Sequence, residues 1–184
     1  YTYVFLIERA LYNNHYYVIC LLSFLLFLAP LHRSFSIDAL RQKVVKSDKL
    51  PALWLWLFRL EMGIVYFYGG LAKLDRDWLN GNAPEALFRI ATFETPLAQL
   101  IEWKSVPVFY GWSGFIFDLI IPFLMLWKPT RIPAFIMAVF FHVHNYFVFT
   151  IGIFPVLALV LTLLYFEPDF PKKISKYIYK YWNF

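Results

Sequence analysis

Long apolar runs separated by short polar and basic stretches dominate the pattern of this chain. A helix of about 20 residues crosses the apolar core of a bilayer. On this criterion the runs predict membrane spans at about residues 16–31, 53–73, 106–127, 132–150 and 153–166. The fold class that follows is all-α, a polytopic transmembrane helix bundle that forms a single membrane domain over residues 1–184.

The pattern changes between the second and third apolar runs. Residues 74–105 mix apolar, aromatic and polar side chains, and Gly81, Pro84 and Pro96 interrupt them. Amphipathic segments of this kind predict short interfacial helices that lie along the membrane surface. At the other end of the chain, residues 167–184 form a basic tail that is rich in aromatic side chains.

The composition supports a membrane protein. Hydrophobic residues make up 61% of the chain, aromatic residues 22% and charged residues only 16%, with a mean hydropathy of +0.58. Soluble domains carry more charge than this. Because the chain begins at Tyr1 within an apolar stretch, we expect a fragment of a longer protein. The single Cys20 lies in an apolar run and excludes both a disulfide framework and a Cys-rich metal site.

The basic residues give the predicted spans an orientation. Most of them fall in the loop before residue 50, in the turn near residue 130 and in the tail. The positive-inside rule assigns those segments to the cytoplasm. His15 and Lys73 then share the outer face, which is periplasmic or lumenal. The net charge of +5 comes from clusters at membrane edges, which suit anionic headgroups better than nucleic acid.

Lys73 ends the apolar run 53–73 and is the first candidate for chemistry. Arg59, Tyr66 and Lys73 are seven residues apart, so each falls about 20° from the last on one stripe of a helix. Gly69 and Gly70, one turn before the lysine, would let a neighbouring helix or a flat ligand approach the backbone. A lysine that only snorkels to the headgroups explains the position alone. A catalytic amine would require an enclosed, apolar site.

Other polar residues lie within the predicted spans, where they are functional candidates by default. For Asp118 and Arg59 we favour a structural role, with Asp118 linked to Arg59 or to a histidine. His142 and His144 are about 200° apart on a helix, so they cannot share a metal ion from one face. His142 and Asn145 do share a face, although a lone buried histidine is more often a hydrogen-bonded structural residue.

Asn14 and His15 stand at the entrance of the first span. Helix capping explains Asn14 better than it explains His15, because asparagine is a preferred cap and histidine is not. Glu61 is two residues from Arg59 and therefore points to nearly the opposite face. Each of these two charges needs a partner on another element.

Four blocks of this sequence carry a resemblance to a known family. They are Asn13-Asn-His-Tyr16, Tyr66-Phe-x-x-Gly-x-x-Lys-Leu-Asp-x-Asp-Trp78, Phe141-His-x-x-Asn145 and Ile151-Gly-x-Phe154. In this order and spacing, the chain resembles the membrane domain of the vitamin K-dependent gamma-glutamyl carboxylase family, also called the horizontally transferred transmembrane domain. A bacterial homologue is the expected source.

The resemblance implies a mechanism. The lysine that matches Lys73 deprotonates reduced vitamin K, so that oxygen adds and a strongly basic anion forms. That species removes a proton from the gamma carbon of glutamate, and the carbanion captures carbon dioxide. The histidine that matches His15 acts at the glutamate step, with Asn14 beside it, and His142 matches a histidine near the active centre. Such an enzyme is a carboxylase of the lyase class.

Together, these observations predict a quinol site at the outer half of the bundle. Its expected catalytic residues are Lys73 and His15, and its expected binding residues are Asn14, Tyr66, Gly69, Gly70, His142 and Asn145. The expected cofactor is reduced vitamin K or menaquinol, with O2 and CO2 as co-substrates and no metal. The expected partners are the lipid bilayer, the quinol and a glutamate-containing protein or peptide, with no nucleic acid.

Two functions from other classes stay open. The chain could be a quinone-interacting membrane subunit that passes electrons without carboxylating a substrate. It could also be a noncatalytic membrane module that associates with a partner, in which Lys73 and the histidines are structural.

Overall fold

Helices supply the regular structure of the described chain. The computed structural model describes residues 2–7, 14–33, 36–47, 49–92, 102–149 and 151–182. Within these ranges every regular element is helical, which confirms the all-α class. Asn13 of the first sequence block and residues 93–101 of the expected interfacial region lie outside the described residues.

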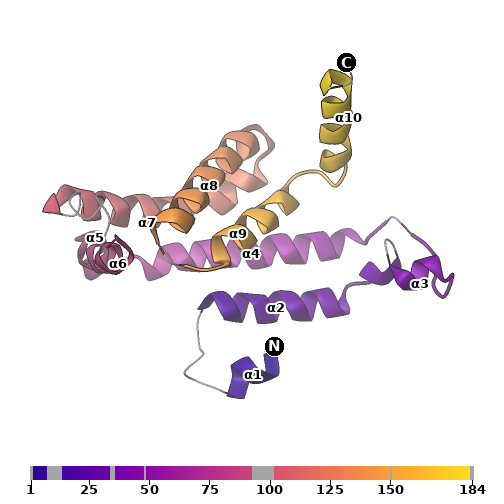
Figure 1. Ribbon diagram of the computed structural model, residues 1–184, viewed down its shortest axis with the longest axis horizontal. Coiled ribbons are helices and arrows are strands. Elements are labelled where there is room, and N and C mark those ends of the chain that lie inside the picture. Colours follow the sequence, from indigo (N-terminus) through magenta and orange to yellow (C-terminus); the bar gives the residue numbers. More distant parts are fainter. Residues whose placement is uncertain are drawn as a thin grey trace. The chain divides into compact units, whose positions relative to one another are not determined.

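The chain divides into two compact units, Tyr1–Glu61 and Met62–Phe184. The helices of the first unit are α1 (Thr2–Ile7), α2 (Asn14–Leu28), η2 (Leu31–Arg33), α3 (Ile37–Leu40) and the first half of α4 (Ala52–Ala72). Those of the second unit are the rest of α4, α5 (Arg76–Leu79), α6 (Asn82–Thr92), α7 (Ser105–Leu126), α8 (Lys128–Val148), α9 (Phe154–Thr162), η4 (Leu163–Tyr165) and α10 (Phe170–Trp182). Figure 1 labels the α-helices along the chain.

A sharp turn between α5 and α6 brings both short helices against α7. Gly81 occupies this turn with φ of +86°, a left-handed conformation that glycine adopts without strain. A Cβ atom at Gly81 would lie 2.7 Å from the backbone nitrogen of Val108, so only glycine allows this approach. Phe88 of α6 is buried and packs edge-on against Tyr110 of α7. Within the described part of the region 74–105, residues 76–92 therefore form the short helices α5 and α6.

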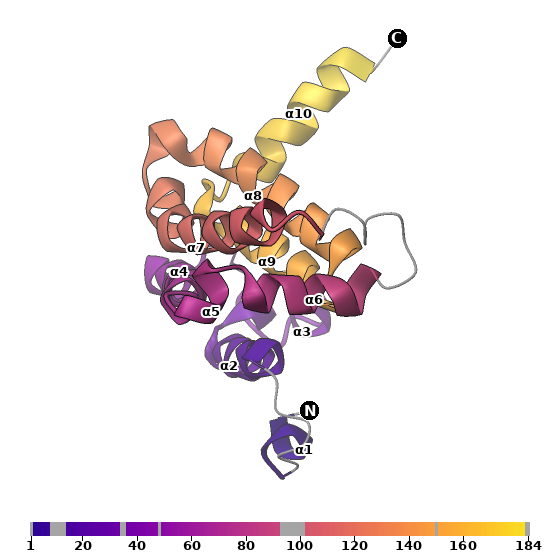
Figure 2. The same cartoon turned by 90° about the vertical axis from the view of Figure 1, so that its left-hand side faces the viewer.

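The helices α7 and α8 form a tight hairpin. The turn is closed from the start of α8, where the Thr130 hydroxyl donates to the Leu124 carbonyl at 2.7 Å and Arg131 Nε donates to the Met125 carbonyl at 2.9 Å. Small residues of α8, Ala134 and Ala138, are fully buried, which lets the helices pack closely. Figure 2 shows α9 beside this hairpin.

One described helix, α7, is by itself long and apolar enough to cross a membrane. Two bent pairs of helices would raise the number to three if each pair forms one span. Several large apolar side chains of α7 are exposed, including Phe109, Ile116 and Phe123, as expected for a helix that faces lipid. The chain thus contains a candidate membrane-spanning helix, and the five-span topology stays a prediction.

Candidate functional site

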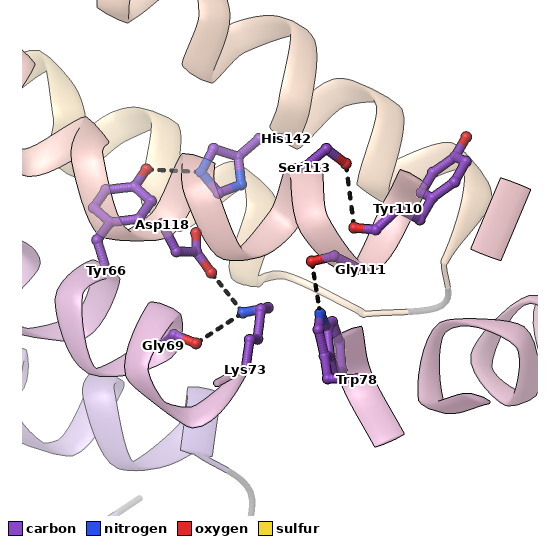
Figure 3. Close-up of polar contacts among 9 residues, drawn as sticks. All are labelled: Tyr66, Gly69, Lys73, Trp78, Tyr110, Gly111, Ser113, Asp118 and His142. Atoms are coloured by element: carbon purple, nitrogen blue, oxygen red, sulfur yellow. Dashed lines mark hydrogen bonds and ion pairs between the residues drawn. The ribbon is translucent and has the colours of Figure 1, made fainter. Parts of the chain in front are cut away.

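Lys73 follows α4 directly and pairs with an acid on α7. Its Nζ lies 2.5 Å from Asp118 Oδ2 and donates a second hydrogen bond to the Gly69 carbonyl at 3.1 Å (Figure 3). The side chains of Lys73 and Asp118 are 21% and 12% exposed. The pair is therefore largely enclosed, yet both charged groups retain some access from outside.

Glycines make room for this pair. At Gly70 an added Cβ would lie 2.9 Å from the backbone nitrogen of Leu119, so α4 touches the backbone of α7 there. Of the two expectations for the glycine pair, close approach of a neighbouring helix is what the structure shows at Gly70. On α7, Gly114 lies under the lysine, because a Cβ there would meet Lys73 Cε at 3.7 Å.

Trp78 of α5 closes the site on another side. Its indole Nε1 donates to the Gly111 carbonyl at 3.1 Å, which holds the ring against α7. The ring centroid lies 5.2 Å from Lys73 Nζ, within the range of a cation–π contact. The Asp118 carboxylate, the Gly69 carbonyl and the Trp78 ring therefore surround the Lys73 amine with groups that attract a cation.

A second, fully buried polar chain joins three helices behind the ion pair. Tyr66 of α4 contacts His142 of α8 at 2.7 Å between the hydroxyl and Nε2, and contacts Thr162 of α9 at 3.2 Å between the hydroxyls. The Thr162 hydroxyl donates its proton to the Ala158 carbonyl at 2.6 Å. Thr162 can therefore only accept from Tyr66, because a hydroxyl carries one proton.

The direction of the whole chain follows from this constraint. Tyr66 uses its single proton toward Thr162, so all three contacts are hydrogen bonds only if His142 Nε2–H donates to the Tyr66 oxygen. Neutral His142 then carries its proton on Nε2 and leaves Nδ1 as the acceptor nitrogen. Tyr66 is 3% exposed and His142 is 2% exposed. In this structure both are closed off from a ligand, and direct quinol contact by them stays a prediction.

The second histidine of α8 has a separate partner. His144 Nε2 lies 2.8 Å from the Tyr110 hydroxyl, whereas His142 contacts Tyr66. The two rings thus face different elements, as their angular separation on the helix requires. Across the described ranges, no group of three or more metal-ligating side chains comes together.

The remaining predicted residues lie on α2 and α8. Asn14 is exposed and is the first residue of α2, and His15 beside it is half-buried. Both belong to the first unit, so their proximity to Lys73 stays a prediction. Asn145 is half-buried near the end of α8, and its carbonyl accepts from the Phe149 nitrogen at 2.9 Å.

Arg59 and Glu61, the two charged residues of α4, differ in their contacts. The Arg59 guanidinium lies over the Trp56 ring at 5.0 Å from its centroid. Both carboxylate oxygens of Glu61 are buried without a hydrogen-bond partner among the described residues.

The sequence pattern identified the wrong partner for Asp118 and missed two residues of the site. Asp118 pairs with Lys73, where the pattern favoured Arg59 or a histidine. Thr162 and Trp78 were not predicted as site residues. The sequence did contain a pattern that could have indicated Asp118 as a site residue. Gly111, Gly114 and Asp118 fall on one face of α7, so two small residues and a carboxylate face the same neighbour.

Comparison with known proteins gives one family match. The model of a family described as the HTTM domain matches residues 1–170. The match includes the Lys73–Asp118 pair and the Tyr66–His142–Thr162 chain, and it ends at the first residue of α10. No solved structure matches the chain.

Proposed function

The chain belongs to the HTTM domain family, the domain found in vitamin K-dependent gamma-carboxylase, and from this premise we propose that it is a quinol-dependent, carboxylase-type membrane enzyme. Its reaction would couple quinol oxygenation to the carboxylation of glutamate. The active site would open toward the periplasmic or lumenal side, as the distribution of basic residues favours.

The Lys73–Asp118 ion pair is the observation that carries this proposal. A base that deprotonates a quinol needs an amine in an enclosed site and a place for the proton. The low exposure of both side chains supports the first requirement, and the 2.5 Å contact between Nζ and Oδ2 supports the second. The partial exposure of the two side chains leaves a route for a quinol hydroxyl.

The pair can accept one proton without creating an isolated charge. A proton that moves from Lys73 Nζ to Asp118 Oδ2 converts the ion pair into a neutral amine and a carboxylic acid. The amine then takes a proton from the quinol hydroxyl and becomes an ammonium ion again, beside the anion of its substrate. Reduced vitamin K or menaquinol, with O2, would supply the strongly basic species that glutamate deprotonation requires. CO2 would then be captured by the glutamate carbanion.

The buried chain supports the pair from behind. Tyr66 lies two turns before Lys73 on α4, and Phe117, next to Asp118 on α7, contacts the Tyr66 ring edge-on at 6.0 Å. The hydrogen bonds that join Tyr66 to His142 of α8 and Thr162 of α9 therefore hold α4 beside these two helices, and the Phe117 contact holds it beside α7. We assign His142 and Tyr66 to positioning in the closed arrangement. His15 and Asn14 are proposed to act at the glutamate step, on the basis of the family resemblance.

A stoichiometric assay tests the proposal. The protein is reconstituted with reduced quinone, a glutamyl peptide and labelled bicarbonate, and both quinol consumption and label incorporation are measured. The proposal predicts label in the peptide in proportion to the quinol consumed. Quinol oxidation without label would instead favour an electron-passing subunit. If quinol neither reacts nor shifts the melting temperature, a noncatalytic module becomes the better assignment.

A further inference from the structure

The C-terminal helix α10 leaves the bundle at a right angle. The segment Phe154–Tyr165, which comprises α9 and η4, and the following Phe170–Lys176 meet at 92°. Figures 1 and 2 both show α10 extending away from α7, α8 and α9. If the α9–η4 segment runs along the membrane normal, α10 therefore lies parallel to the membrane plane.

Ion pairs fix this corner at one end of the candidate span α7. Glu167, in the corner, pairs with Lys128 at 3.1 Å, and Lys128 begins α8 two residues after α7 ends. Lys173 of α10 reaches back to Glu167 at 3.0 Å and to Asp169 at 2.9 Å. Hydrogen bonds from Lys173 and Lys128 lower the pKa of Glu167 to about 2. The start of α10 is thus joined to the turn between α7 and α8.

Aromatic contacts reinforce the corner. Phe166 stacks on Phe170 with ring centroids 4.3 Å apart, and its other side meets Phe135 of α8 edge-on at 5.2 Å. Trp127, in the turn between α7 and α8, is largely exposed at the same end. Exposed tryptophans are enriched at the membrane–water interface, which agrees with an interfacial position for the corner.

The sequence of α10 separates apolar and basic positions onto two faces. With about 100° per residue, Phe170, Ile174 and positions 177, 178 and 181 fall within an arc of about 100°. The lysines fall on the opposite side, and the helix sequence contains no acidic residue. They are Lys172, Lys173, Lys176 and Lys180.

The lysines of α10 differ in whether they form ion pairs within the protein. Lys173 forms ion pairs with Glu167 and Asp169. Lys172 and Lys176 are exposed, and neither forms an ion pair with an acid within the described ranges. Their charges are available for an external anion, while Ile174 on the other face is 42% exposed.

We propose that α10 is an in-plane helix that binds the anionic phospholipid surface of one leaflet, with Lys172 and Lys176 contacting headgroup phosphates. A helix with one basic and one apolar face, positioned at a membrane edge, has the properties of such an anchor. The positive-inside rule assigns it to the cytoplasmic leaflet, where anionic lipids attract basic segments. This role is independent of the quinol chemistry.

The test uses spin labels on the full chain in nanodiscs. Cysteines replace Ile174 or Ser175 in a Cys20→Ser background, and each label is probed with oxygen, which partitions into lipid, and with a water-soluble nickel complex. In discs that contain phosphatidylglycerol, the label at 174 should favour oxygen and the label at 175 should favour nickel. Discs of phosphatidylcholine alone should show a weaker contrast.

A matched pair of variants isolates the role of the lysines. Lys172→Gln with Lys176→Gln should shift the equilibrium toward released α10 by about 30-fold, since each lysine near an anionic surface contributes about fivefold. Lys43→Gln with Lys46→Gln removes the same charge from an exposed loop and should leave the contrast unchanged. Equal nickel access at 174 and 175 in phosphatidylglycerol discs would overturn the proposal, as would a contrast that is the same in both lipids.

Discussion

Replacement of Asp118 by asparagine probes the ion pair with the smallest change of shape. Asparagine keeps the size of the side chain and removes its charge, so Lys73 loses its anionic partner. Lysine in a largely enclosed site is then left with the Gly69 carbonyl and the Trp78 ring as its contacts. We expect both the stability and the quinol-dependent turnover to fall.

The size of the effect follows from the burial of the pair. Breaking a fully buried ion pair costs about 3–5 kcal/mol, and breaking an exposed pair costs about 0.2–1 kcal/mol. With side-chain exposures of 21% and 12%, the pair lies nearer the buried limit, at about 2–3 kcal/mol. For a domain of this size that corresponds to a melting temperature roughly 5–10 °C lower.

Thermal unfolding of purified variants measures this cost. Glu85→Gln is the matched control, because Glu85 and Arg89 form an exposed ion pair on α6, with side chains 38% and 63% exposed. Loss of this pair should lower the melting temperature by less than roughly 2 °C. A double variant, Lys73→Met with Asp118→Asn, leaves neither charge alone and should be more stable than the sum of its single changes predicts. Strictly additive effects, or a melting temperature unchanged by Asp118→Asn, would refute the pairing.

Three further predictions follow from the described contacts. Thr162→Val should lower stability by about 1–3 kcal/mol because a buried acceptor is lost, whereas Thr162→Ser keeps it; equal melting temperatures for the two would contradict the hydrogen-bond chain. Gly70→Ala should destabilise the protein, since its Cβ would lie 2.9 Å from the backbone nitrogen of Leu119. Gly114→Ala should be tolerated, because its Cβ would lie 3.7 Å from Cε of the flexible Lys73 side chain. The melting temperatures of the two variants test this difference. The pKa of Glu167 is lowered from 4.5 to about 2. Its stabilisation of the corner is therefore complete above about pH 4.5 and is lost as the pH falls through about 2. The mobility of a spin label on α10 should show this acid step in the wild type and lack it in Glu167→Gln.

The apolar pattern located the main helices because burial in lipid requires long, uninterrupted apolar runs. The run 53–73 corresponds to α4, Ala52–Ala72, and the run 106–127 corresponds to α7, Ser105–Leu126. The boundary of α8 was less clear, since the helix begins at Lys128 within a segment that reads as a basic turn. Pro129 is compatible with this start, because the first turn of a helix needs no hydrogen bond from its nitrogen.

Contacts between helices could not be read from one sequence. Lys73 and Asp118 are 45 residues apart, and Tyr66 and Thr162 are 96 residues apart. Periodicity identifies the faces of a helix and leaves open which faces meet, because helix rotation and pairing depend on packing of the whole bundle. Asp118 was therefore recognised as a buried acid without its partner. Thr162 lies in an apolar run where a threonine carries no distinctive pattern.

The family assignment depended on motifs and not on the pattern of hydrophobicity. Apolar runs predict any helical membrane protein, whereas the ordered blocks around His15, Lys73 and His142 indicated one family, and the HTTM match over residues 1–170 confirms it. The blocks named residues whose chemistry is shared within that family. They gave no indication of Asp118, which lies between two of them.

Label incorporation by a Lys73→Ala variant tests the central claim most directly. Wild-type protein, Lys73→Ala and Lys104→Ala are compared with reduced quinone, a glutamyl peptide and labelled bicarbonate, after the melting temperatures show that each variant is folded. Lys104 is an exposed lysine before α7 whose side chain caps no helix. The account predicts that Lys73→Ala loses label incorporation while Lys104→Ala keeps the wild-type rate. Incorporation at the wild-type rate by folded Lys73→Ala would contradict it.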